Sequence, residues 1–313
     1  MKPAFSVIFL TTLIGAGQGL LIALVLGQFY LGSESGGFFA LGGVLALVML
    51  GLGLVASVFH LANPQRGWRA ATRWRTSWLS REVLMIPALC ALAFLYTLIH
   101  AIGWAPVLMT FGNGKTLDLP MALGLLVVLG SVALFVCTGM IYACVRFIRQ
   151  WASSWTVVNY LLMGLASGFT LAAAYAQIQA NALSGFMSGA ALVLTVAALA
   201  ARTFQLWLNA RTKPQSTMKS AIGLHHTQIR QVTQGFMGQS FNTIEFAAPG
   251  GAETVRGLTV FFLLVAFVIP AALLLAGLPV LAFVCQYVGL LAERWVFFAA
   301  GSHVQNLYYQ AKG

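Results

Sequence analysis

The chain has 313 residues, of which 60% are hydrophobic and 7% are charged, and its formal net charge at pH 7 is +11. This composition lies far outside the range of soluble globular domains and predicts an all-α integral membrane protein without a soluble catalytic domain. No basic segment with interleaved aromatic residues stands apart from the apolar stretches, which argues against a nucleic-acid partner.

Eight membrane-spanning helices fit the chain as a single membrane domain over residues 1–313. Each crossing requires about 20 mainly apolar residues, and charged positions mark the limits. The first apolar stretch is too long for a signal peptide, so it is expected to remain as a helix. The expected limits, in chain order, are 4–30, 37–61, 82–104, 119–144, 155–176, 184–206, 257–276 and 280–301.

The connections between the eight spans alternate in their content of lysine and arginine. Only Lys115 falls on the side opposite the N-terminus. Because cytoplasmic connections carry an excess of these residues, both termini are predicted to be cytoplasmic. Much of the net charge then reflects topology and contact with membrane lipids. The residues on the N-terminal side are Lys2, Arg66, Arg69, Arg73, Arg75, Arg81, Arg146, Arg149, Arg211, Lys213, Lys219, Arg230 and Lys312.

The segment 209–253 is the one long polar stretch between spans, and it is rich in Gln, Thr, Ser and Gly. It is too small for an enzyme domain, so we expect a cytoplasmic docking loop for an extrinsic subunit; the alternative is a partly disordered linker.

Neither the glycine-rich segment nor the cysteines nor the histidines indicate a nucleotide, metal or haem site in this chain. The GAGQG at Gly15–Gly19 lies inside an apolar stretch with no preceding strand, so close helix packing is expected instead of a nucleotide loop. The four cysteines form no CxxC pair, and no metal site is predicted. The five histidines are poorly placed for axial ligands on facing helices, so no haem is expected.

His60 and Glu82 form the first candidate site, at the end of span two and the start of span three. The connection between them carries five arginines and is short enough to make the two helices neighbours. A quinone headgroup needs hydrogen-bond donors for its carbonyl oxygens and takes up protons on reduction, which a histidine and a carboxylate can supply. The alternative is that His60 is an interfacial residue and Glu82 only caps a helix.

Glu293 and Arg294, within span eight, form the second candidate site. Charged groups inside an apolar helix are costly, so both are expected to face protein partners or a water-filled pocket. Arg202 either belongs to the same cluster or extends to the interface. A secondary transporter is the alternative of another class, but it predicts internal repeats that this sequence lacks.

Several segments carry a resemblance to a known family. SVFHLANPQRG, which contains His60, and LSREV, which contains Glu82, look like the membrane anchor subunit of the dimethyl sulfoxide reductase family. The opening PAFSVIFLTTLIGAGQGL, the segment SFNTIEF and the late pair Glu293 and Arg294 strengthen the match. The flanking sequence resembles more closely the anchors of cytoplasmic sulfite dehydrogenases.

The resemblance implies an eight-helix anchor without haem in the bacterial cytoplasmic membrane. It implies that the chain has no catalytic site for the substrate and holds an iron–sulfur subunit and a molybdopterin catalytic subunit on the cytoplasmic face. Those partners carry the iron–sulfur clusters and molybdopterin, while the anchor exchanges their electrons with quinone, either ubiquinone or menaquinone. Sulfite oxidation with quinone reduction is expected; a dimethyl sulfoxide-type reductase oxidising quinol and an anchor without a quinone site are the alternatives.

The resemblance also implies roles for individual residues. His60 and Glu82 match the family's residues for quinol binding, and four further residues are expected in the same pocket: Arg66, Arg81, Glu293 and Arg294. Partner docking is expected at Arg69, Arg73, Arg75, His225, His226, Phe241 and Asn242.

Overall fold

Eight helices long and apolar enough to cross a membrane occur in the described part of the chain, as the sequence predicts. The structure is a computed structural model, and it describes residues 2–31, 36–59, 61, 63–110, 116–213, 216–223, 226 and 250–303. The first four spans are α1 (Phe5–Leu31), α2 (Gly36–Val58), α3 (Trp78–Ile102) and α4 (Leu119–Ala143). The others are α5 (Ser154–Ile178), α6 (Ser184–Arg211), the composite of α9 (Gly251–Leu263), η3 (Leu264–Val268) and α10 (Ile269–Leu275), and α11 (Pro279–Ala299).

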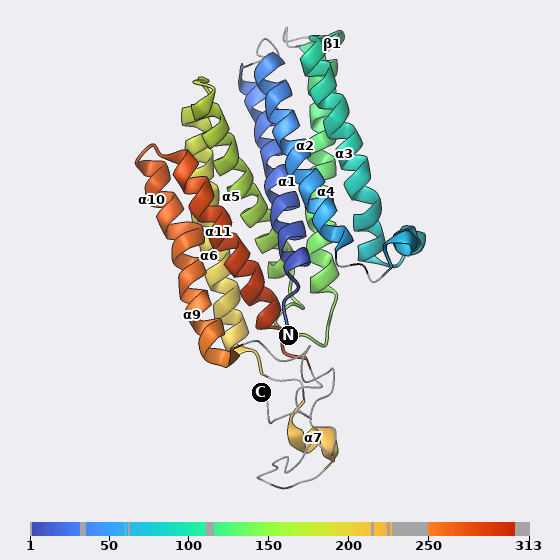
Figure 1. The fold of residues 1–313 in the computed structure, drawn as a ribbon, viewed down its shortest axis with the longest axis vertical. Helices are drawn as coiled ribbons and strands as arrows, with labels where there is room; N and C mark the ends of the chain where they lie inside the picture. The colour runs from blue at the N-terminus through green and yellow to red at the C-terminus, as the bar shows by residue number, and fades with distance from the viewer. Residues whose placement is uncertain are drawn as a thin grey trace.

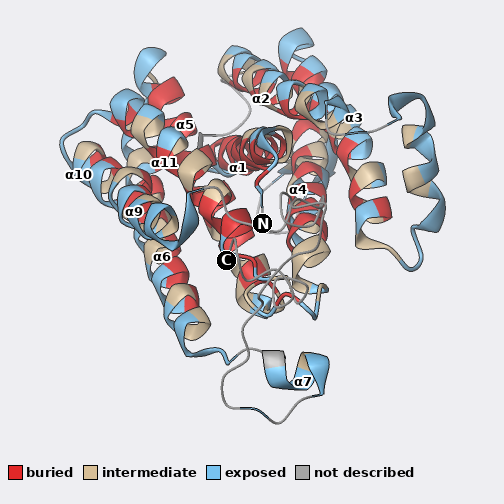
Figure 2. Cartoon of the chain, turned by 60° about the horizontal axis from the view of Figure 1, so that its bottom comes forward, coloured by how far each residue is buried: buried red, intermediate tan, exposed pale blue. Residues whose placement is uncertain are grey.

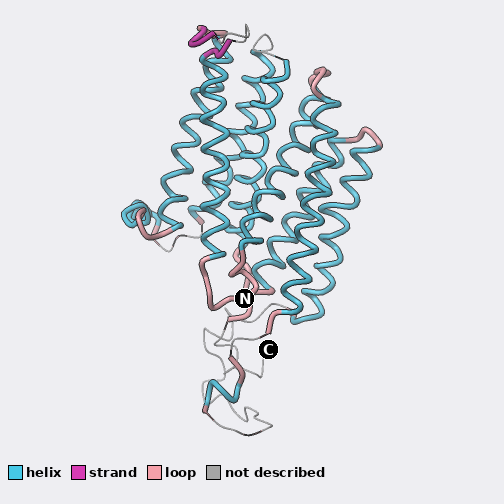
Figure 3. Tube along the Cα trace, turned by 180° about the vertical axis from the view of Figure 1, so that it is seen from behind, coloured by secondary structure: helices cyan, strands magenta, loops and turns pink. Residues whose placement is uncertain are grey.

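Three short elements lie outside the spans. The 3-10 helix η2 (Pro64–Arg73) precedes α3 and projects sideways from the bundle (Figure 1). The strands β1 (Val107–Thr110) and β2 (Thr116–Asp118) pair antiparallel at the opposite end, where Figure 3 draws them in magenta. The helix α7 (Met218–Ile222) extends beyond the bundle from α6.

The two ends of the bundle differ in charge. The start of α1, η2, the α4–α5 connection and the end of α11 share one end, which we call the basic end (Figure 1). Its described cationic residues outside the spans include Lys2, Arg66, Arg69, Arg73, Arg75, Arg146 and Arg149. The described part of the opposite end carries Asp118 and no lysine or arginine.

Helices α1 and α5 form the centre of the bundle (Figure 2). Their most apolar windows are 78% and 72% buried, against 44% or less for the other six spans. The helices approach closely because glycines face each other. A Cβ added at Gly19 would lie 2.2 Å from the carbonyl oxygen of Gly164, and one at Gly168 would lie 2.2 Å from the carbonyl carbon of Gly19. The expectation that GAGQG serves close helix packing is therefore confirmed at Gly19.

A π-helical turn, η3, interrupts the seventh span next to α11. Pro270, just after this turn, has no N–H to donate to the preceding turn, which favours such an irregularity. Gly289 of α11 packs against it, because a Cβ there would lie 2.3 Å from the backbone nitrogen of Ala266. This close contact fixes the part of α11 that carries Glu293 and Arg294 one turn later.

Helix α3 begins earlier than the charge pattern suggested. It starts at Trp78 instead of residue 82, with the Ser77 side chain as N-cap accepting from the backbone N–H of Ser80. Arg81 is accommodated because its guanidinium donates to the carbonyl oxygens of Trp74 and Arg75, each at 2.9 Å. Glu82 consequently lies inside the helix and is not its cap, which removes the capping alternative for this residue.

Candidate functional site

Glu82 lies buried near the basic end, in the second turn of α3. Its side chain is 8% exposed, and its Oε1 accepts a hydrogen bond of 2.5 Å from the hydroxyl of Thr138 in α4. A carboxyl group in the apolar part of a membrane helix is costly and marks a functional position by default.

A narrow cavity with both polar and apolar lining, which we call the polar cavity, adjoins Glu82 between α1, α3, α4, α5 and α11. The Glu82 carboxyl group and the Arg294 guanidinium both line it. Its remaining polar lining comes from Thr11, Thr12, Gln18, Thr138, Tyr160 and Ser167. The lining side chains leave room for little more than a water molecule, so a larger ligand enters only if side chains move.

Gln18 supplies an unused hydrogen-bond donor to this cavity. The residue is 1% exposed, and its Nε2 atom has no hydrogen-bond partner among the described residues. Leaving a buried donor unpaired costs about 1–3 kcal/mol, so such a group is expected to serve a ligand or a water molecule. The cavity therefore combines free donor capacity with a carboxyl group and a cation.

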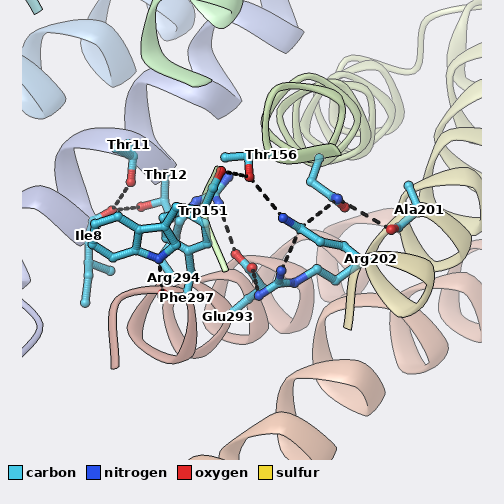
Figure 4. A network of polar contacts seen from close by, with 12 residues as sticks. Ile8, Thr11, Thr12, Trp151, Thr156, Ala201, Arg202, Glu293, Arg294 and Phe297 are labelled. Atoms are coloured by element: carbon cyan, nitrogen blue, oxygen red, sulfur yellow. Dashed lines mark hydrogen bonds and ion pairs between the residues drawn. The ribbon is translucent and has the colours of Figure 1, made fainter. Parts of the chain in front are cut away.

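Arg202, Glu293 and Arg294 form a buried ion cluster beside the cavity (Figure 4). Glu293 is 0% exposed, and its carboxylate lies 2.8 Å from Nη2 of Arg202 and 3.3 Å from Nη1 of Arg294. The expectation that Arg202 belongs with this pair is thus confirmed. Two guanidinium groups share one carboxylate, which leaves the cluster with an excess positive charge.

Polar and aromatic neighbours hold the two arginines of this cluster. Arg202 also donates to Oε1 of Gln205 at 2.8 Å, and Gln205 in turn donates to the hydroxyl of Thr156. The guanidinium of Arg294 lies 3.6 Å from the centre of the Tyr160 ring, a cation–π contact. These contacts direct Arg294 toward the cavity wall.

The other predicted site residues are not brought to the cavity. Arg66 is exposed on η2, and Arg81 contacts backbone carbonyl groups of the loop before α3. The predicted docking residues Arg69, Arg73, Arg75 and His226 are all exposed. Four predicted residues lie outside the described part of the chain: His60, His225, Phe241 and Asn242.

Neutral polar residues make up much of the cavity, and no charge marks them in the sequence. Thr138, Tyr160 and Gln18 each stand in a helix that contains no charged residue. The available signal was spacing: Thr11 and Gln18 are seven residues apart, which places both on one face of α1. Without knowing that α5 packs against α1, the sequence does not bring Tyr160 to that face.

A second buried polar group lies at the opposite end of the bundle. Oε1 of Gln28 accepts from the hydroxyl of Tyr96 at 3.0 Å and lies 3.2 Å from Nε2 of His100. The rings of Tyr96 and Phe39 pack against the imidazole. These three polar side chains satisfy one another, which fits a structural role. Among the described residues, no group of three or more His, Cys, Asp or Glu side chains is arranged to hold a metal ion.

Comparison with known proteins finds a matching family and two relatives. The family model of the DMSO reductase anchor subunit (DmsC) matches residues 1–302. A sulfite dehydrogenase subunit of Allochromatium vinosum is 47% identical, with 99% of each chain covered. Anaerobic dimethyl sulfoxide reductase chain YnfH of Escherichia coli is 32% identical over 130 residues, which cover 41% of each chain.

Proposed function

Because the chain belongs to the family of DMSO reductase anchor subunits, we propose that this membrane anchor is also the quinone-reactive subunit of its oxidoreductase complex. In this role it passes electrons between a partner iron–sulfur subunit and quinone in the bacterial inner membrane. A molybdopterin subunit, bound through the iron–sulfur subunit, carries the catalytic site.

The polar cavity at the basic end is the observation that carries this proposal. A bound quinone would accept two electrons and two protons there. The residues fit that chemistry, since the unpaired Nε2 of Gln18 and the hydroxyl of Tyr160 can donate to carbonyl oxygens. The Arg294 guanidinium would favour negative charge on an oxygen bound beside it.

Glu82 is proposed to move protons between the cavity and water. The carboxyl group is hydrogen-bonded to Thr138 and lies in the second turn of α3, close to the basic end of the bundle. A carboxyl in this position can release a proton to a cavity oxygen and regain one from the aqueous side. His60, two residues beyond the end of α2, is proposed as the second proton-exchanging group on the strength of the sequence resemblance.

The basic end is proposed to face the cytoplasm and to bind the partner subunits there. Its excess of arginine and lysine over the opposite end supports this orientation. The exposed Arg69, Arg73 and Arg75 of η2 and the following turn, together with the segment 209–253, would contact the iron–sulfur subunit. Electrons from its last cluster would then enter the membrane on the side where the polar cavity lies.

We propose that electrons flow from sulfite to quinone, because the relative that matches over 99% of both chains is a sulfite dehydrogenase subunit. The alternative is a reductase of the dimethyl sulfoxide type that oxidises quinol, as the name of the second relative suggests.

The test is sulfite-driven reduction of quinone by the whole complex in membrane vesicles. Glu82→Gln is expected to reduce quinone turnover about 10²-fold or more while reduction of a soluble artificial acceptor persists. Asp118→Asn, a matched carboxyl-to-amide change at the opposite end, should leave both rates unchanged. Unchanged quinone turnover in Glu82→Gln, with the partner subunits still bound, would refute the assignment of the cavity.

A further inference from the structure

An apolar groove opens on the outer surface of the bundle near the basic end, between α1, α9 and α11. Its volume is about 210 Å³, and it is lined only by apolar side chains, among them Phe5 and Phe9 of α1, Leu258 of α9 and Trp295 of α11. Phe5 and Phe9 are 65% and 40% exposed, so the groove faces the surrounding lipid. We call it the α1–α11 groove.

The α1–α11 groove and the polar cavity lie on two sides of the same helix pair. On α11, Leu290 and Arg294 line the cavity, whereas their neighbours Leu291 and Trp295 line the groove. On α1, Thr12 lines the cavity and Ile8, one turn earlier on the same face, lines the groove, so the two spaces follow one another along α1. The groove and the cavity are therefore separated by the contact between α1 and α11.

Few strong contacts close this seam between α1 and α11. The hydroxyl groups of Thr12 and Tyr287 lie 3.3 Å apart, which is longer than a normal hydrogen bond between hydroxyl groups and therefore weak. Ile8 is 1% exposed and fills the space on the groove side. Leu290 and Leu291, adjacent on α11, line the cavity and the groove respectively.

We propose that the α1–α11 groove binds the polyisoprenoid tail of quinone while the headgroup occupies the polar cavity. This inference rests on the proposed function. The tail is apolar and has to remain in contact with hydrocarbon, whereas the cavity has room for little more than a water molecule. The tail must therefore leave between two helices, and the α1–α11 seam is bordered by the cavity on one side and by a wholly apolar groove on the other.

A second apolar groove lies between α1 and α2 and provides an internal comparison. It is larger, about 390 Å³, and Leu13, Val55 and Ala56 are among its lining residues. Leu13 is on the face of α1 turned away from Thr11 and Gln18, which line the cavity. The two grooves meet at Phe9, which lines both, but at Leu13 helix α1 lies between the second groove and the cavity. Lipid acyl chains are the expected occupants of the second groove.

The two grooves allow a matched test by filling each with an indole ring. Ala292→Trp fills the α1–α11 groove and Ala56→Trp fills the α1–α2 groove; both alanines are half-buried and helical. Leu258→Trp provides a second variant in the first groove, on a helix that does not line the cavity. The whole complex is assayed in vesicles with menadione and menaquinone-4, or with ubiquinone-0 and ubiquinone-4, so that each headgroup is tested with and without a tail.

Ala292→Trp and Leu258→Trp are expected to raise the KM for the tailed quinone about tenfold, the effect of displacing roughly two buried methylene groups. The KM for the tail-less quinone should stay within about twofold, as should both values for Ala56→Trp. An unchanged KM for the tailed quinone, an equal increase for both quinones, or a selective increase in Ala56→Trp would overturn the inference. If the wild-type complex reduces none of these quinones, with or without a tail, the proposed function itself is refuted.

Discussion

Replacing Glu293 by glutamine is expected to destabilise the anchor strongly, because Glu293 is the ion-pair partner of both Arg202 and Arg294. Its carboxylate lies 2.8 Å and 3.3 Å from the two guanidinium groups, and the residues Glu293, Arg202 and Arg294 are 0%, 3% and 4% exposed. Removing one partner of a buried ion pair costs about 3–5 kcal/mol, since the remaining charge stays buried without compensation. This corresponds to a loss of about 10²- to 10⁴-fold in the folding equilibrium.

The assay is unfolding of the anchor by sodium dodecyl sulfate in the purified complex. Glu253→Gln is the matched control, because Glu253 is exposed in the first turn of α9 and its loss should cost about 0.5 kcal/mol. The double variant Arg202→Gln with Glu293→Gln should recover part of the loss, since it removes one charge of each sign. If Glu293→Gln is no more harmful than Glu253→Gln, or if the double variant costs the sum of its parts, the buried cluster does not stabilise the bundle.

Two further predictions concern the packing and orientation of the helices. Gly168→Ala should destabilise the anchor by about 1–3 kcal/mol through overpacking against Gly19, whereas Gly189→Ala should be neutral because a Cβ there meets no atom within 4 Å; equal unfolding midpoints would contradict the α1–α5 contact. With the exposed Cys144 replaced by serine, Thr76→Cys should react with a membrane-impermeant thiol reagent only in inside-out vesicles and Met109→Cys only in right-side-out vesicles. The reverse pattern would place the basic end outside the cytoplasm.

The number of spans follows from the sequence because it depends on local quantities, the length and charge content of apolar stretches. The internal organisation of the bundle does not, because every helix here is apolar on most faces and gives no strong direction for packing. The glycines of α1 indicated a close contact but not its partner, which the structure identifies as Gly164 and Gly168 of α5.

The sequence predicts only part of the candidate site, because it marks the charged residues but not the neutral residues that packing brings beside them. Glu82, Glu293 and Arg294 stand out because a charge in an apolar helix is costly wherever it points. Gln18 and Thr138 do not stand out, since neutral polar side chains occur often in membrane helices and bond to their own backbone. The resemblance also predicts Arg66 and Arg81 in the pocket. The structure places Arg66 on η2 and Arg81 in the first turn of α3, where it binds backbone carbonyl groups of the preceding loop.

Photo-crosslinking of an azido-quinone to the complex, followed by mapping of the labelled residues, tests the central claim most directly. The account predicts labels on residues that line the polar cavity at the basic end, in α1, α5 and α11, and their loss on competition with unlabelled quinone. Labels that gather instead around Gln28, Tyr96 and His100 at the opposite end, or that resist competition, would contradict it.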